Sequence, residues 1–363
     1  MTTAGPVAVA IPADFPWKRL FMKQEDLLTM FAALSSLQPA DRVVKTDWHV
    51  IMMPQLTVEQ KRLHLSNTAL GDLDGQYIMA IYDDMADYLS FNMLSDYWTE
   101  EERLSAFRRG HESPLTYWSA NKTEILSLAS QGMSADDAKS PLIVAKAARE
   151  LVYAKSHEVS SQRPMALFIL LSLLFPSADR SDHYHLEMCC GFGNNLIACL
   201  AAGVGHFHGV EPRASLHPKY AEIVQTLDSK RAASGTYTTY VGGFEDVQLD
   251  NQFDSICFSP PYWDFEVYDV SASSSSQSIV RHATFGEWYD NFLLASCVKA
   301  WAHLRHGGYF LLIANHTTKR ENYIYRLLAD MKEVTGGSFC GTLPFGRSNG
   351  TKVQPFFVWQ KEG

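Results

Sequence analysis

A glycine turn between a predicted strand and a predicted helix constrains the fold of this chain more than any other feature. The turn occupies residues 187–195, which read EMCCGFGNN, and it joins a strand at 183–189 to a helix at 193–202. Glycine at two positions lets the backbone turn sharply and lets a ligand approach closely. The first amides of the following helix have no partners inside the helix, so they can bind a carboxylate. This order predicts an α/β fold with a ligand site at the turn.

From residue 161 onward, predicted strands alternate with predicted helices, which favours a mostly parallel sheet covered by helices on both faces. The strands are predicted at 183–189, 206–211, 236–241, 253–259 and 309–314, and the helices at 164–175, 193–202, 215–227, 285–304 and 321–331. The runs 338–345 and 353–360 are predicted to pair as a final hairpin. Ligands of such sheets bind beyond the carboxyl ends of the strands, where the glycine turn falls.

Residues 1–155 read instead as a mainly helical region. Its helices are predicted at 23–37, 57–65, 85–93, 99–110 and 134–154, with an extended stretch at 43–54. We therefore predict two parts, an accessory region at 1–155 and a catalytic domain at 156–363. Target recognition and oligomerisation, including a homodimer, are the roles open to the first part.

The charge of the chain bears on its partners. The formal net charge is −9, with 14 basic against 20 acidic residues in 1–150 and 17 against 20 in 151–363. Because phosphate neutralisation drives nucleic-acid binding, such a function needs a local basic face on this acidic chain. No apolar run reaches the roughly 18–20 residues of a membrane span, and the start lacks a signal-peptide pattern. We expect a cytoplasmic or nucleoid-associated protein with no membrane partner.

Cysteine and histidine usage predicts no metal site. All six cysteines lie at or after position 189, and their spacing matches no zinc pattern, so we expect reduced thiols. Histidines alternate at positions 183 and 185 and at 206 and 208 on two neighbouring strands. We interpret them as packed or exposed side chains rather than ligands.

Two further features accompany the glycine turn. Glu211 ends the strand 206–211, where a carboxylate can accept hydrogen bonds from two ribose hydroxyls. A dinucleotide would also suit this arrangement, but position 196 is Leu where the dinucleotide fingerprint has its third glycine. Residues 259–263 read SPPYW at the end of the strand 253–259. Two prolines there end the strand and fix the backbone, either as a rigid turn with core aromatics or as part of a site.

Taken in order, these segments resemble the S-adenosylmethionine-dependent DNA amino-methyltransferases. The segments that carry the resemblance are Arg163-Pro164, the glycine turn, Gly209-Val210-Glu211 and the SPPYW run, with the stretches 285–292 and 304–309 also similar. The SPPY form is most similar to the cytosine-N4 enzymes, whereas adenine-N6 enzymes more often begin with Asp or Asn. The resemblance implies a Rossmann-like seven-stranded methyltransferase sheet with a C-terminal antiparallel hairpin, preceded by the mainly helical region. It also implies methyl transfer to an exocyclic amino group of a DNA base, with cytosine N4 first and adenine N6 as the alternative.

The resemblance also assigns roles to residues. The Ser259 hydroxyl and the Pro260 carbonyl would accept the N–H groups of the target amine, and Tyr262 and Trp263 would bind the base. The catalytic residues implied are Ser259, Pro260, Pro261 and Tyr262. The residues implied for S-adenosylmethionine are Glu187, Cys189, Cys190, Gly191, Phe192, Gly193, Glu211, Pro212, Phe244, Ser259 and Arg163. A base inside a duplex cannot reach such a site, so the DNA base would be flipped out or single-stranded.

Three departures from the family pattern keep other functions open. The family's glycine loop reads DPFxGxGT, whereas this chain reads EMCCGFGN and keeps the acid. The acid after the third strand is replaced by Gly242-Gly243-Phe244, which leaves Glu245 or Asp246 as a substitute. No long target-recognition segment follows either motif, so residues 1–155 and 271–278 are the candidates. RNA, a nucleotide or a modified base, a non-catalytic binding role, and different group-transfer chemistry are the alternatives.

Overall fold

The computed structural model describes most of the chain in twelve segments. They are residues 15–38, 43–46, 77–82, 85–131, 133–159, 161–177, 179–228, 235–263, 265–269, 277–314, 323–347 and 353–362. The predicted helix at 57–65, residues 47–54 of the extended stretch at 43–54, and most of the serine-rich stretch at 271–278 lie outside the described residues.

Seven strands of the C-terminal half form the core of the central sheet. They are β4 (Tyr184–Glu187), β5 (His206–Glu211), β6 (Thr236–Val241), β7 (Phe253–Phe258), β9 (Leu304–Ile313), β10 (Ser338–Arg347) and β11 (Val353–Gln360). Their order is β10-β11-β9-β7-β4-β5-β6. The five strands from β9 to β6 are parallel, and β11 pairs antiparallel with both β9 and β10. The predicted fold class, an α/β protein with a mostly parallel, Rossmann-like sheet that ends in an antiparallel hairpin, is confirmed.

The strand order reverses between β4 and β7. From β4 the chain proceeds to β5 and β6 on one side, whereas β7 and β9 continue on the other side. The connections that leave the carboxyl ends of β4 and β7 therefore diverge and leave a crevice between them. The glycine turn follows β4 and the SPPYW run follows β7, so both motifs reach this crevice.

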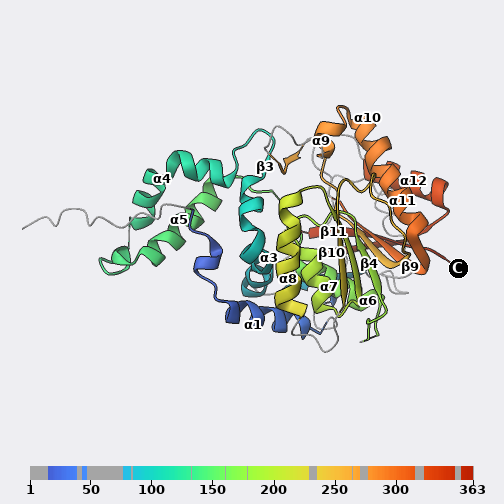
Figure 1. Ribbon diagram of the computed structural model, residues 1–363, viewed down its shortest axis with the longest axis horizontal. Helices are drawn as coiled ribbons and strands as arrows, with labels where there is room; N and C mark the ends of the chain where they lie inside the picture. Colours follow the sequence, from blue (N-terminus) through green and yellow to red (C-terminus); the bar gives the residue numbers. More distant parts are fainter. Residues whose placement is uncertain are drawn as a thin grey trace, which may run out of the picture.

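Helices cover both faces of the sheet (Figure 1). One face carries α1 (Gln24–Ser35), α3 (Met85–Ser105), α6 (Pro164–Leu174), α7 (Asn194–Ala201) and α8 (His217–Leu227). The other face carries α10 (Phe285–Trp288), the π-helix η7 (Tyr289–Leu294), α11 (Ala295–His303) and α12 (Tyr323–Thr335). Apolar side chains from each helix layer pack on the sheet in two large cores, as expected for parallel strands buried on both faces.

The N-terminal region is mainly helical, as predicted, but it also contributes strands. Its remaining elements are η1 (Lys18–Leu20), α4 (Pro114–Ser130), η4 (Asp137–Lys139) and α5 (Pro141–Lys155), with β1 (Val43–Thr46), β2 (Tyr77–Tyr82) and β3 (Phe107–Arg108). β2 pairs parallel with β10, and β1 pairs with β2, so the described sheet has nine strands rather than seven. The helices α4 and α5 pack together at the end of the molecule away from the sheet (Figure 1).

Several predicted boundaries are wrong. The predicted helices 85–93 and 99–110 are one helix, α3, and α4 has no counterpart among the predictions. The helix predicted at 285–304 is helical throughout 285–303 and contains the π-helical segment η7 in its middle. It ends at His303, and β9 begins at the next residue, Leu304. Gly307 and Gly308 therefore lie inside β9 rather than stopping the helix, and Gly307 takes a positive φ of 79° there. The remaining elements are η5 (Ala214–Leu216), β8 (Glu266–Val267) and α9 (Ser278–Arg281).

We predict that Gly205→Ala destabilises the protein by about 3 kcal/mol, because a side chain there meets backbone that cannot yield easily. A Cβ atom on Gly205 would lie 1.6 Å from the carbonyl oxygen of Ser181. Gly286→Ala is the matched control, since a Cβ there meets no atom within 4 Å. Urea unfolding of both variants tests this, and equal stability of the two variants would contradict the packing described.

Candidate functional site

A pocket lies beyond the carboxyl ends of β4, β5 and β7, where the sequence predicted a ligand site. Its walls come from the glycine turn, the residues after β5, the turn after β6, and the start of the SPPYW run. Residues of β8 and α9 complete the wall on the side of the SPPYW run. The pocket therefore unites segments that are far apart in the sequence.

The glycine turn takes the conformation that its glycines permit. Gly191 has a φ of 52° and Gly193 a φ of 83°, a left-handed backbone that favours glycine. Gly193 is the N-cap of α7, and a Cβ there would lie 3.0 Å from Ile223. Gly191 and Phe192 line the pocket together with Cys189 and Cys190, whereas Gly193 does not.

Side chains from outside the glycine turn hold it in place through hydrogen bonds. The Gly191 amide donates to Glu211 Oε2 at 2.9 Å, which ties the turn to the end of β5. The Tyr220 hydroxyl of α8 donates to the Gly191 carbonyl. The Thr99 hydroxyl of α3 lies 3.0 Å from the Phe192 carbonyl. The carbonyls of Gly191 and Phe192 thus both accept hydrogen bonds from side chains of helices outside the turn.

Glu187 is fully buried at the end of β4 and lies behind the pocket wall rather than on it. Its Oε2 accepts a hydrogen bond from Asn195 Nδ2 at 2.5 Å, and its Oε1 has no hydrogen-bond partner among the described residues. Burial raises the pKa of this carboxyl to about 8, although the bond from Asn195 opposes the shift. Glu187 therefore stays largely protonated near neutral pH unless a cation reaches it.

A row of polar side chains continues from Glu187 under the helices α6 and α7. His185 Nε2 lies 4.0 Å from Glu187 Oε2, and both side chains have no exposed surface. His185 Nδ1 and His183 Nε2 each lie 2.7 Å from Ser255 Oγ. Burial lowers the pKa of His185 to about 3 and that of His183 to about 4, so both imidazoles are neutral at pH 7.

Glu211, predicted to hold a ribose, already has partners. Its Oε1 accepts from the Arg213 amide at 3.1 Å and from Arg213 Nε at 3.0 Å, and its Oε2 accepts from Gly191. The Arg213 guanidinium also lies over the rings of Phe192 and Tyr268, at 4.9 and 5.5 Å from their centroids. Glu211, Pro212 and Arg213 all line the pocket. The predicted acid therefore lies at the pocket wall as an ion pair with the Arg213 guanidinium.

The turn after β6 supplies the third wall. Phe244 is 2% exposed and lines the pocket, with the Lys299 ammonium 4.9 Å from its ring centroid. Of the two proposed substitutes for the missing acid, Glu245 lines the pocket and Asp246 does not. Glu245 Oε1 pairs with Arg281 at 2.7 Å, and its Oε2 has no hydrogen-bond partner among the described residues.

The SPPYW run enters the pocket only in part. Ser259 and Pro261 line it, whereas Pro260, Tyr262 and Trp263 do not. The Tyr262 ring packs edge-on against Phe265, with centroids 6.3 Å apart. Trp263 donates from Nε1 to the His282 carbonyl at 3.4 Å. The two aromatic side chains are half-buried and follow Pro261, which lines the pocket.

Some lining residues were missed. The sequence implicated Arg163, the N-cap of α6, but the preceding Ser161 and Gln162 line the pocket instead. The Asn194 amide donates to Ser161 Oγ, and the Asn195 amide donates to Gln162 Oε1 at 3.0 Å. Two adjacent amide side chains at a helix start were a signal for these contacts. Arg213, Glu266 and Tyr268 also line the pocket without having been predicted, and Gln277 of the candidate recognition stretch 271–278 lines it too.

The described residues lack a metal site and a membrane-spanning helix. No group of three or more His, Cys, Asp or Glu side chains there is placed to hold a metal ion. All six cysteines are free thiols, and burial raises the pKa of those in the glycine turn well above the usual value. None of the helices in these segments is both long enough and apolar enough to cross a membrane.

No protein-family model matches the sequence, and no curated protein matches it. Solved structures similar to part of this chain include a methyltransferase from Pyrococcus furiosus, with 16% identity over 56% of this chain and 84% of that chain and a TM-score of 0.36. An rRNA methylase from Streptococcus thermophilus has 11% identity over 56% and 100% of the two chains, with a TM-score of 0.36. Fibrillarin from Aeropyrum pernix, solved with natively bound S-adenosyl-L-methionine, has 13% identity over 54% and 73%, with a TM-score of 0.34. Likenesses this distant carry no argument about activity.

We predict that Glu187→Gln flattens the pH dependence of stability between pH 7 and about 8. In this window the native carboxyl, with a pKa of about 8, holds a proton that the unfolded chain, with a usual value of 4.5, has released. The native state binds more protons, so the free energy of unfolding falls as pH rises towards 8. The neutral His183 and His185 add little slope above pH 7.

Urea unfolding at pH 7, 7.5 and 8 measures this effect. The unmodified protein is expected to lose about 1 kcal/mol across the window, and the variant much less. The same slope for both proteins would show that Glu187 is not protonated in the native state.

Proposed function

We propose that this chain is an S-adenosylmethionine-dependent methyltransferase that methylates an exocyclic amino group of a nucleobase in DNA. Cytosine N4 is the first choice of target, and adenine N6 is the alternative. One observation carries the proposal: Gly191 of the glycine turn and Ser259 of the SPPYW run line the same pocket. A pocket of this kind would bring a cofactor held by the turn to an amine held by the serine.

Buried oxygen atoms near the glycine turn fit the ammonium group of S-adenosylmethionine. Asn194 Oδ1 and Asn195 Oδ1, from residues that line the pocket, and Glu187 Oε1, which lies behind its wall, are buried and have no hydrogen-bond partner among the described residues. An alkylammonium group brings three N–H donors, whereas a buried acceptor without a donor costs free energy. A cation beside Glu187 would also favour the ionised carboxylate. These atoms therefore support the methionine end of the cofactor at this place.

The pocket residues at the end of β5 and after β6 suit a nucleoside. A carboxylate offers about four lone-pair sites, and Glu211 uses three of them on Gly191 and Arg213. It can accept one ribose hydroxyl as it stands, and a second if the Arg213 side chain turns away. Glu245 Oε2 offers an acceptor for an adenine amino group, and Phe244 offers an apolar border.

Methyl transfer by direct displacement requires the protein mainly to position the two reactants. When bound, S-adenosylmethionine supplies the methyl group from its sulfonium, and the overall reaction yields the methylated amine, S-adenosylhomocysteine and one proton. The amino nitrogen of cytosine is conjugated with its ring and is a poor nucleophile. The hydroxyl of Ser259, which lines the pocket, and the carbonyl of Pro260, which follows it outside the lining, would accept its N–H groups and turn the nitrogen lone pair towards the cofactor. Holding the reacting groups in line accounts for much of the acceleration.

The target base must leave a duplex or come from a single strand, at a cost of a few kcal/mol. Tyr262, half-buried beside the pocket, would stack on the extruded base. The net charge of −9 argues for a binding face confined to part of the surface rather than spread over it.

The decisive experiment transfers labelled methyl groups from S-adenosylmethionine to duplex DNA, single-stranded DNA and RNA, followed by mass spectrometry of the nucleosides. We expect N4-methylcytosine in DNA. N6-methyladenine in DNA would support the proposed DNA amino-methyltransferase activity but make adenine the target base. Label in RNA alone would overturn the DNA assignment. Cofactor binding without methylation of any of the three would overturn the enzymatic proposal.

Tyr262→Ala is expected to lower kcat/KM for DNA by about ten- to a hundredfold, because stacking of a base on an aromatic ring contributes about 1–3 kcal/mol. The affinity for S-adenosylmethionine should not change, since Tyr262 does not line the pocket. Tyr262→Phe keeps the ring and is the matched control, with activity close to that of the unmodified protein. Full activity of Tyr262→Ala would remove this residue from the mechanism.

A further inference from the structure

Helix α3 of the N-terminal region contacts the glycine turn through a buried hydrogen bond. Thr99 Oγ1 lies 3.0 Å from the Phe192 carbonyl oxygen, and Thr99 has no exposed surface. The same hydroxyl lies 3.0 Å from the Ser95 carbonyl within α3, so the two carbonyls share its one proton. Phe192 is itself 4% exposed and lines the pocket. A buried carbonyl in the turn thus depends on a side chain about ninety positions earlier in the sequence.

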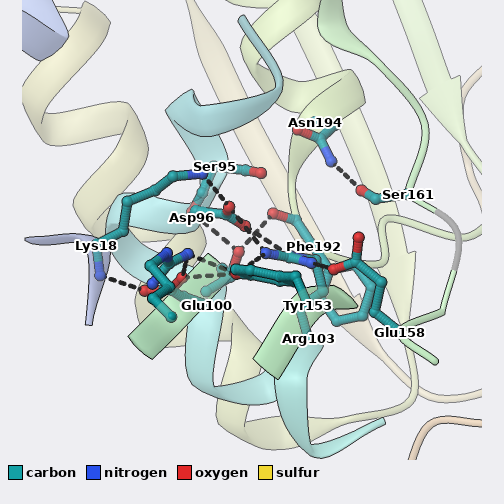
Figure 2. Close-up of polar contacts among 12 residues, drawn as sticks. Lys18, Ser95, Asp96, Glu100, Arg103, Tyr153, Glu158, Ser161, Phe192 and Asn194 are labelled. Atoms are coloured by element: carbon teal, nitrogen blue, oxygen red, sulfur yellow. Dashed lines mark hydrogen bonds and ion pairs between the residues drawn. The ribbon is translucent and has the colours of Figure 1, made fainter. Parts of the chain in front are cut away.

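A network of buried charges holds this part of α3 in place (Figure 2). Asp96 accepts from Lys18 Nζ at 2.7 Å and from Arg103 Nε at 2.7 Å. Glu100 accepts from the Lys18 amide at 2.6 Å and pairs with Arg149 of α5. Asp96 and Glu100 are one turn apart on α3 and flank Thr99, so the network fixes the face of the helix that meets the turn.

The network is balanced in charge. Its three cations are Lys18, Arg103 and Arg149, and its three anions are Asp96, Glu100 and Glu158. The Tyr153 hydroxyl joins the Arg103 and Arg149 parts of the network, and burial raises the pKa of this phenol. Burial alone would raise the pKa of Asp96, but Arg103 and Lys18 lower it to about 2. Every charge therefore has a partner of opposite sign, and the network requires no bound ion.

The residues that follow α3 contact the segment after the SPPYW run. β3 pairs antiparallel with β8, which follows the SPPYW run, and the Arg109 amide donates to the Phe265 carbonyl at 2.8 Å. Ala106 at the same end packs with Phe192 and Tyr268, both of which line the pocket. One segment, residues 85–109, thus touches the glycine turn and the loop after the SPPYW run.

We propose that Thr99 is a positioning residue for the glycine turn, and that the charge network places α3 to make this contact. The helical region would then be part of the cofactor site rather than a separable accessory. The identity of the turn's ligand as S-adenosylmethionine rests on the proposed function. The contact between Thr99 and the turn does not depend on that function.

Thr99→Val tests the inference, because valine keeps the shape of threonine and removes its hydroxyl. Hydrogen exchange of the amides at 191–195, measured without cofactor, is expected to become about five- to tenfold faster, with no change in β9. The dissociation constant for S-adenosylmethionine, measured by calorimetry, is expected to rise about five- to tenfold, whereas kcat at saturating cofactor should hold. Thr99→Ser restores a hydroxyl and should restore both values.

Thr29→Val is the matched control, since Thr29 donates to a carbonyl within α1 in the same way but lies exposed and away from the turn. If Thr99→Val does not fold, Thr99→Ala removes the same hydroxyl and takes its place. Unchanged exchange at 191–195 in a folded variant would overturn the positioning role. Faster exchange together with no cofactor binding by the unmodified protein would support that role and overturn the proposed function instead.

Discussion

The divergence of the chain after β4 and β7 is the constraint on which the rest of this structure depends. Because β5 and β6 extend the sheet on one side and β9 on the other, the loops after β4 and β7 leave in opposite directions and open a crevice. The glycine turn fills one side of that crevice with a backbone that only small residues adopt easily. The SPPYW run, stiffened by two prolines, supplies the other side. Sheet topology, rather than any single side chain, brings the two motifs into one pocket.

A row of buried polar groups lies behind this pocket. Strands buried on both faces normally carry apolar residues, yet one face of β4 presents His183 beside its first residue, then His185 and Glu187. Ser255 links the two imidazoles, and Asn195 satisfies one oxygen of the carboxyl. Such a row costs stability compared with packed hydrocarbon, because its groups lose water. Local rules of this kind are most often broken at functional sites, and this row ends at the glycine turn.

The sequence predicted most of the C-terminal architecture because each strand and helix there carries its own local signal. The strands at 206–211 and 236–241 have the predicted bounds, and the positions of the glycine turn and Ser259 followed from the parallel topology. The missed features depend on long-range pairing. β2 joins the central sheet through its pairing with β10, and Tyr268 and Glu266 reach the pocket where β8 pairs with β3. Thr99 carries no local signal at all, since its role depends on how α3 docks against a turn formed much later in the chain.

The most direct test of the central claim is a calorimetric titration of the full chain with S-adenosylmethionine, run beside NAD. We expect one S-adenosylmethionine bound per chain and no heat from NAD, because position 196 is Leu where dinucleotide sites have a third glycine. Binding of NAD, or the absence of S-adenosylmethionine binding by a folded protein, would contradict the assignment of the pocket.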